Sequence, residues 1–158
     1  MNGPSYLETA QGRRIAYHLT AGEGPCVVFL GGLKSDMEGT KAIHLEDWAR
    51  EKGRAFLRFD YSGHGQSSGT FEEGCIGDWE SFDADQKAQL EETGRVELPS
   101  DYMEPYVVTK RMVEDGRAHL VLRDPLELPF AVRMLLGTAD TAVSVATATR
   151  LLDHAASP

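Results

Sequence analysis

Two short apolar runs on either side of an amphipathic stretch constrain the fold of this chain more than any other feature. Cys26–Leu30 is continuously apolar, and Ala55–Phe59 is apolar apart from one arginine. Runs of this kind are typical of strands that are buried on both faces, as in parallel sheets. Between them, residues 39–52 carry apolar side chains at helical spacing, and a glycine follows that can end a helix. The pattern predicts a strand–helix–strand unit with parallel strands and a right-handed crossover.

Further elements are expected on both sides of this unit. Apolar and polar residues alternate over Arg14–Leu19, which predicts a half-buried strand, with Tyr6–Thr9 as its partner. Ala131–Leu136 is a third candidate for a buried strand, and Val145–Ala155 keeps helical spacing. We therefore predict one α/β domain over residues 1–158, a reduced and mostly parallel sheet flanked by helices.

Two more helices are expected in the middle of the chain. Asp83 and Gln86 have the spacing of a capping box, which predicts a helix that begins after Asp83. Pro105 is suited to the first turn of a helix that would run to Gly116. Ala21–Pro25 is expected to be a loop because of its glycines and proline.

Composition narrows the classes of partner. The 158 residues include 25 acidic and 16 basic side chains, a formal net charge of −9, which argues against binding to nucleic acids or to anionic membranes. Cys26 and Cys75 make neither a disulfide framework nor a metal-binding spacing. Residues 1–14 lack the apolar region of a secretory signal. The sequence thus predicts a cytoplasmic protein that uses no metal and no cofactor.

Three glycine-containing segments follow predicted strands, namely Gly31–Asp36, Asp60–Ser67 and Gly137–Asp140. In open α/β sheets, ligands bind outside the carboxyl ends of the strands. Glycines at these ends let backbone N–H groups approach a developing oxyanion. For each segment alone, a tight turn from strand to helix is the simpler explanation. The three together in this order favour a site.

These segments resemble the α/β-hydrolase superfamily, and the region from Leu98 to Arg117 resembles its bacterial esterase- and thioesterase-like branch. In that family, a strand ends in a glycine-containing oxyanion loop, as Phe29–Leu33 does here, and the next strand ends in Asp-x-x-Gly-x-Gly-x-Ser, as at Asp60–Ser67. A later strand is followed by Gly-x-x-Asp, as at Gly137–Asp140, whose aspartate is the acid of the catalytic triad in the family. The resemblance implies hydrolysis of a carboxylic ester or thioester, with a small-molecule acyl ester or thioester as the ligand.

Two pieces of the family pattern have no counterpart in the expected places. The family's nucleophile elbow is Gly-x-Ser-x-Gly between a strand and a helix, and the one literal match, Gly65–Gly69, lies in the other glycine loop. The segment that carries the triad histidine is also absent, since His154 falls in the last predicted helix. We interpret residues 79–82 as a deletion junction. The missing strand would leave the edge of Cys26–Leu30 open, unless Ala131–Leu136 takes its place. An open edge predicts a homodimer through that edge or an exchange of strands between chains.

The resemblance and the remaining residues give a candidate site and two interpretations. Asp140 would orient a histidine, Ser67 and His64 would be nucleophile and base, and the backbone at Gly32 and Leu33 would stabilise the oxyanion. Ser62 and Ser35 are alternative nucleophiles, and His154 is an alternative base. The first interpretation is an ester or thioester hydrolase with a rewired or impaired triad. The alternative is a non-catalytic binding module that keeps the acyl crevice, and a truncation product without a selected function is a third.

Overall fold

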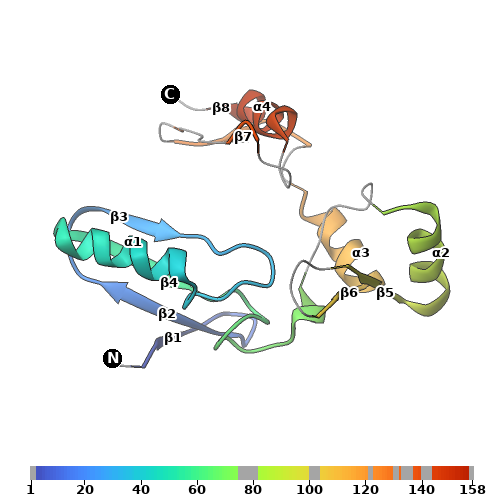
Figure 1. Cartoon of the computed structure of the whole chain (residues 1–158), viewed down its shortest axis with the longest axis horizontal. Coiled ribbons are helices and arrows are strands. Elements are labelled where there is room, and N and C mark those ends of the chain that lie inside the picture. The colour runs from blue at the N-terminus through green and yellow to red at the C-terminus, as the bar shows by residue number, and fades with distance from the viewer. Residues whose placement is uncertain are drawn as a thin grey trace.

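The computed structural model of the chain gives a four-stranded mixed sheet with one helix against it (Figure 1). The strands lie in the order β1-β2-β4-β3, and α1 connects β3 to β4. Their bounds are β1 Ser5–Glu8, β2 Arg14–Thr20, β3 Glu23–Phe29, α1 Thr40–Glu51 and β4 Arg54–Phe59. The structure describes residues 3–74, 82–99, 104–120, 123–129, 132, 137–139 and 144–156.

The predicted strand–helix–strand unit is confirmed, since β3 and β4 pair in parallel and α1 lies between them in the chain. The fold class is α/β, but the sheet is less parallel than expected. Both β1 with β2 and β2 with β4 pair antiparallel. The strand β3 also begins at Glu23, inside the segment expected to be a loop, and its register with β4 shifts between Glu23 and Val27.

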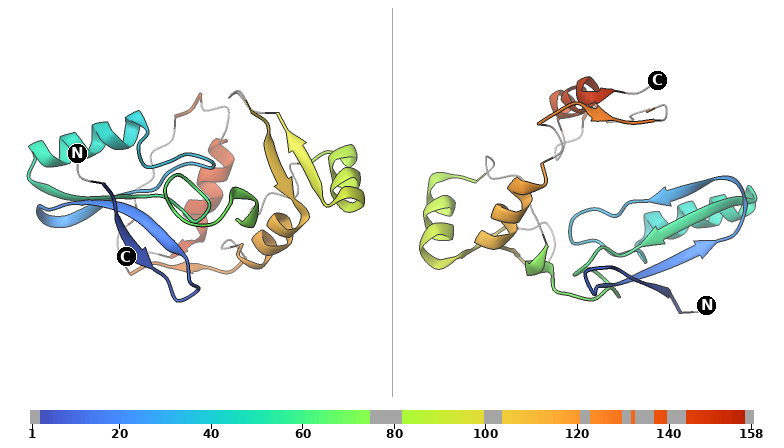
Figure 2. Two further views of the ribbon diagram at one scale, coloured as in Figure 1. Left: turned by 90° about the horizontal axis from the view of Figure 1, so that it is seen from below. Right: turned by 180° about the vertical axis from the view of Figure 1, so that it is seen from behind.

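The two faces of this sheet differ in what covers them. The helix α1 buries Ala42 and Ala49 and packs beside β4. It covers the face that carries Phe56 and Arg58, since Arg58 bonds to Glu46 of α1. The opposite face has no helix against it among the described residues (Figures 1 and 2). The prediction that Cys26–Leu30 is buried on both faces is therefore wrong, because Val28 is 48% exposed and Leu30 is 65% exposed.

A second group of elements forms its own small core (Figure 1). It consists of α2 Ala84–Thr93, β5 Arg95–Leu98, β6 Tyr106–Thr109 and α3 Lys110–Ala118. The predicted capping box is confirmed, since Gln86 N–H donates to the Asp83 carboxylate and Asp83 N–H donates to Gln86. The buried side chains of this core are Phe82, Leu90, Val96, Val108 and Val113.

The sequence missed the antiparallel hairpin of β5 and β6. The helix expected from Pro105 begins only at Lys110, and the four residues before it form β6. Tyr106, two valines and Thr109 all have high strand propensity, which outweighs the helix-opening proline. The hydroxyl of Thr109 then caps α3 by accepting the N–H of Met112.

The last described group is α4 Val145–His154 with the short parallel strands β7 Leu126–Glu127 and β8 Ala155–Ala156. The helix confirms the expected periodicity, and Ser144 caps its first turn, since its hydroxyl accepts the N–H of Thr147. The expected strand Ala131–Leu136 and the proposed junction at 79–82 lie largely outside the described residues. No helix in the described ranges has the length and apolar character needed to cross a membrane.

Candidate functional site

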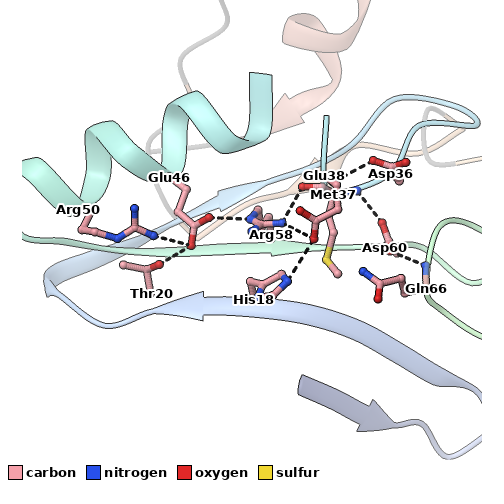
Figure 3. Close-up of polar contacts among 10 residues, drawn as sticks. All are labelled: His18, Thr20, Asp36, Met37, Glu38, Glu46, Arg50, Arg58, Asp60 and Gln66. Carbon is pink, nitrogen blue, oxygen red and sulfur yellow. Dashed lines mark hydrogen bonds and ion pairs between the residues drawn. The ribbon is translucent and has the colours of Figure 1, made fainter. Parts of the chain in front are cut away.

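Two of the three glycine segments meet at one edge of the sheet. The strands β3 and β4 run parallel, so the loops that follow them leave the sheet at the same end. The buried carboxylate of Asp60 joins the loops: its Oδ1 accepts the N–H of Met37 at 2.6 Å and its Oδ2 accepts the N–H of Gln66 at 2.8 Å (Figure 3). Asp60 is 1% exposed, and it therefore fixes the loop after β3 to the loop after β4.

The glycines of Asp-x-x-Gly-x-Gly-x-Ser have a steric explanation here. Gly63 has φ 76°, and a Cβ at this position would lie 2.3 Å from the carbonyl oxygen of Thr70. Gly65 has φ 46°, and a Cβ there would lie 2.2 Å from Oδ2 of Asp60. Only glycine accommodates both the positive φ and the close approach. The pattern thus encodes a compact turn around the Asp60 carboxylate.

Ser67 takes part in the same turn. Its hydroxyl donates to the carbonyl oxygen of Asp60 at 2.7 Å and accepts the N–H of Ala16 at 2.8 Å. The side chain therefore connects the loop to β2. Nucleophilic attack by Ser67 would require both hydrogen bonds to break or rearrange.

Both ring nitrogens of His64 have backbone partners other than Ser67. Its Nε2 accepts the backbone N–H of Lys34 at 3.1 Å, and its Nδ1 lies 3.1 Å from the carbonyl oxygen of Ser62. Ser67 contacts His64 through the backbone, where its N–H donates to the His64 carbonyl at 3.0 Å. The structure brings these two residues into one loop, with each side chain bonded to other groups.

The remaining candidates are more scattered. Ser62 donates its hydroxyl to the carbonyl oxygen of Ser68, Ser35 is exposed, and His154 lies on α4 with its Nδ1 3.3 Å from the carbonyl oxygen of Arg150. Asp140, the proposed acid, lies outside the described residues.

An apolar crevice opens between the two loops and the second group of elements. Its volume is about 440 Å³. Both proposed oxyanion residues line it, and Met112 of α3 also contributes to its wall. The lining residues are Gly32, Leu33, Tyr61, Ser62, His64, Phe71, Gly74 and Met112.

A buried ion pair between Arg58 and Glu46 lies next to the loop that follows β3. Arg58 donates from Nε to Glu46 at 2.8 Å and from its terminal nitrogen to the carbonyl oxygen of Met37 at 2.9 Å (Figure 3). Burial on its own would raise the pKa of the Glu46 carboxyl, but hydrogen bonds from Thr20 and Arg58 and the charges of Arg58 and Arg50 hold that pKa below its ordinary value. Arg58 thus connects α1 to the oxyanion loop.

Sequence reasoning named Asp60 only as the first residue of the glycine pattern, and it gave no role to Arg58 or Lys34. Two signals were available. Arg58 interrupts an otherwise apolar strand, which indicates a paired buried charge. Asp60 opens the glycine pattern, and a carboxylate next to turning N–H groups often accepts their hydrogen bonds.

The fold is shared with proteins of known structure. A crystal structure of a protein from Agrobacterium vitis S4 assigned as a hydrolase superposes with a TM-score of 0.82 and 25% identity, over 99% of this chain and 85% of that one. Mouse alpha/beta hydrolase domain-containing protein 10 superposes with a TM-score of 0.82 and 22% identity, over 99% and 86% of the two chains. The chain therefore shares the α/β-hydrolase fold with these proteins.

Part of the chain is also similar to curated sequences. Palmitoyl-protein thioesterase ABHD10, mitochondrial, from Bos taurus is 40% identical over 75 residues, and so is the Homo sapiens protein of the same name. The match covers 48% of this hydrolase-fold chain and 24% of each relative, so the chain spans about a quarter of the curated relatives it matches. No family model matches the chain.

The expected cytoplasmic location is wrong in the light of these relatives, which are named mitochondrial proteins. The prediction failed because the two criteria behind it, the search for a secretory signal and the cysteine usage, do not separate the cytoplasm from mitochondria. The absence of an apolar stretch excludes a secretory signal, but mitochondrial presequences are amphipathic and lack such a stretch as well. Cysteine usage likewise does not distinguish one reducing compartment from another.

Proposed function

We propose that this α/β-hydrolase chain binds carboxylic esters or thioesters with the acyl group in the crevice, and that it hydrolyses them with an impaired catalytic set. One observation carries the proposal: the glycine loop of Gly32 and Leu33 borders an apolar crevice between the loops after β3 and β4. An acyl chain needs an apolar wall, and its carbonyl needs a backbone donor beside it. The curated relatives are named palmitoyl-protein thioesterases, which favours a thioester of a long acyl chain.

In the catalytic form of the proposal, Ser67 Oγ attacks the acyl carbon while His64 takes its proton and Asp140 orients the imidazole. The N–H of Leu33 stabilises the oxyanion. The carbon–sulfur or carbon–oxygen bond breaks, the leaving group takes the proton from His64, and water then hydrolyses the acyl-serine ester. Turnover is slow because the Ser67 hydroxyl must first leave its partners on Asp60 and Ala16.

A non-catalytic acyl-binding module is the second candidate. The two backbone hydrogen bonds of the Ser67 hydroxyl favour it, because a hydroxyl held in this way stabilises a turn without being activated. This candidate keeps the crevice and the Leu33 donor and dispenses with the covalent step.

A fluorophosphonate probe and a binding probe separate the two candidates. A stoichiometric adduct in the intact mass, mapped to Ser67, supports the hydrolase. No adduct, together with a thermal shift on addition of the thioether S-hexadecyl-N-acetylcysteamine, supports the binding module. No adduct and no shift on folded protein would overturn both.

Two leucines of the same loop provide a matched control for the binding site. Leu33 is 52% exposed and lines the crevice, whereas Leu30 is 65% exposed and is not among the lining residues. We expect Leu33→Glu to abolish the thermal shift by the thioether and Leu30→Glu to preserve it, since only the first places a charge beside the acyl group.

We also propose that the chain forms a homodimer through β3. This strand lies at the end of the sheet order, and its exposed Val27 and Val28 flank an edge with no described partner strand. Charge and proline block such pairing, and in β3 they are confined to Glu23 and Pro25, so Val27–Phe29 is free to pair with another edge. Sedimentation at high concentration should show a dimer that Val28→Lys weakens and that the surface variant Leu120→Lys leaves intact. A monomer throughout the concentration range would contradict the proposal.

A further inference from the structure

The oxyanion loop contains a turn in an unfavourable conformation. Ser35 N–H donates to the carbonyl oxygen of Gly32 at 3.1 Å, which closes a four-residue turn with Lys34 in its third position. Lys34 has φ 57°, and no other described non-glycine residue has a positive φ. An L-residue with a side chain adopts this region only when its surroundings hold it there.

His64 supplies the contact that holds the turn. Its Nε2 is 3.1 Å from the backbone nitrogen of Lys34, and its Nδ1 is 3.1 Å from the carbonyl oxygen of Ser62. An amide N–H can only donate and a carbonyl oxygen can only accept. The neutral ring with its proton on Nδ1 is the form that satisfies both contacts at once.

The ring itself has little freedom to turn. Tyr61 and Phe71 contact it edge-on from two directions, with centroid distances of 5.9 Å and 5.5 Å. The side chain of Lys34 is also held, because its ammonium lies 5.2 Å from the ring centre of Tyr106 and 3.4 Å from the carbonyl oxygen of Pro105. Both ends of Lys34 are thus fixed from outside the turn.

We propose that His64 is a positioning residue for the oxyanion loop, which it holds in its turned conformation by accepting the Lys34 N–H. Leu33, the neighbour of Lys34, lines the crevice, so this contact sets the loop that faces the acyl carbonyl. The role in acyl binding rests on the proposed function, whereas the hold on Lys34 does not. In this role the Nε2 lone pair of His64 accepts the Lys34 N–H. The ring can therefore accept a serine proton only after it releases Lys34.

Nuclear magnetic resonance of the full chain tests the hold without any ligand. Long-range proton–nitrogen spectra above pH 8 should show His64 protonated on Nδ1, and a ring protonated on Nε2 would overturn the proposal. In His64→Ala, the Lys34 amide should exchange with solvent about tenfold faster or more, as expected for loss of one hydrogen bond. His44→Ala, which removes an exposed histidine of α1, is the matched control and should leave that exchange unchanged.

A second pair of variants tests whether the turn is what His64 supports. Glycine adopts a positive φ without penalty, so Lys34→Gly in the His64→Ala background should restore thioether binding that His64→Ala alone weakens. Failure of the rescue in folded protein would contradict the positioning role. If wild-type protein does not bind the thioether, the proposed function fails, and the tautomer and the Lys34 exchange still decide the inference.

Discussion

The two faces of the four-stranded sheet differ more than the sequence of its strands suggests. On the face toward α1, Ala16 and Phe56 are 0% exposed and Arg58 is 5% exposed. On the other face, Leu7 is 59% exposed and Leu19 is 62% exposed, although both belong to paired strands. The same backbone thus carries a packed core on one side and an open apolar surface on the other.

The open face is continuous across the strands. Leu19 lies opposite Leu57, and Tyr17 lies opposite Phe59, in the register of β2 with β4. An open pocket of about 520 Å³ lies on this face. Its lining residues are Leu7, Ile15, Tyr17, Leu19, Leu57 and Phe59. Strands with apolar residues on both faces are typical of sheets with helices on both sides. The strand sequences therefore suit a two-sided sandwich, of which the described residues supply one side.

The largest difference should appear when a large side chain is removed from each face. We expect Phe56→Ala to lower the free energy of unfolding by about 3–5 kcal/mol, because it opens a cavity in a closely packed core. Leu7→Ala on the open face should cost less than about 1 kcal/mol, since its side chain is already largely in water. Urea unfolding of both variants measures the difference. Equal losses would mean that the second face is covered in solution.

The second prediction concerns the polar contacts under α1. Arg58→Met should cost about 3 kcal/mol, because it leaves the buried Glu46 carboxylate without its closest cation. Arg50→Met is the matched control: Arg50 lies 3.3 Å from the same carboxylate, but its side chain is 57% exposed. Its loss should cost less than about 1 kcal/mol. A larger loss from the exposed arginine would show that burial does not set the strength of these pairs.

The contrast between the faces shows that the strands and the helix could be predicted from the sequence, whereas the burial of their faces could not. Strand and helix periodicity over residues 14–59 depends on neighbours in the chain, and it predicted β2, β3, β4 and α1. Burial of β3 depends on what packs beside it, and there the prediction failed. The hairpin of β5 and β6 was missed because four-residue strands are too short for a clear alternation.

The candidate site shows the same limit. The glycine pattern located both loops, because glycines are needed where the backbone turns and approaches closely. The partners of its polar residues come from distant positions: Met37 lies 23 residues before Asp60, and Lys34 lies 30 residues before His64. No local spacing encodes these contacts. The triad proposal for Ser67, His64 and Asp140 stays a prediction.

The third prediction concerns how the free energy of unfolding depends on pH through Glu46, which lies under α1 on the covered face. The pKa of Glu46 is held below its ordinary value, so the folded state favours the charged carboxylate. This stabilisation is complete above the ordinary pKa of glutamate, and it is lost as the pH falls through the lower pKa of the folded state. Arg58 stays charged over this pH range, so it does not itself make the free energy of unfolding depend on pH. Glu46→Gln should flatten the acid limb of a stability profile between about pH 5 and pH 3, and an unchanged slope would contradict the assignment.

The smallest effect is expected on the open face. Leu19→Thr replaces an exposed apolar side chain with a polar one that suits a strand, so the free energy of unfolding should change by about 0.5 kcal/mol or less. The apolar patch becomes smaller, which should lower self-association, since exposed patches drive contact between copies. Light scattering against concentration measures this effect, with Thr20→Val on the opposite face as the reversed control. Thr20 donates to Glu46 at 2.5 Å, so its loss should reduce stability without lowering association. If Leu19→Thr instead destabilises the chain by several kcal/mol, then Leu19 is buried in solution, and the two faces are more alike than the single chain shows.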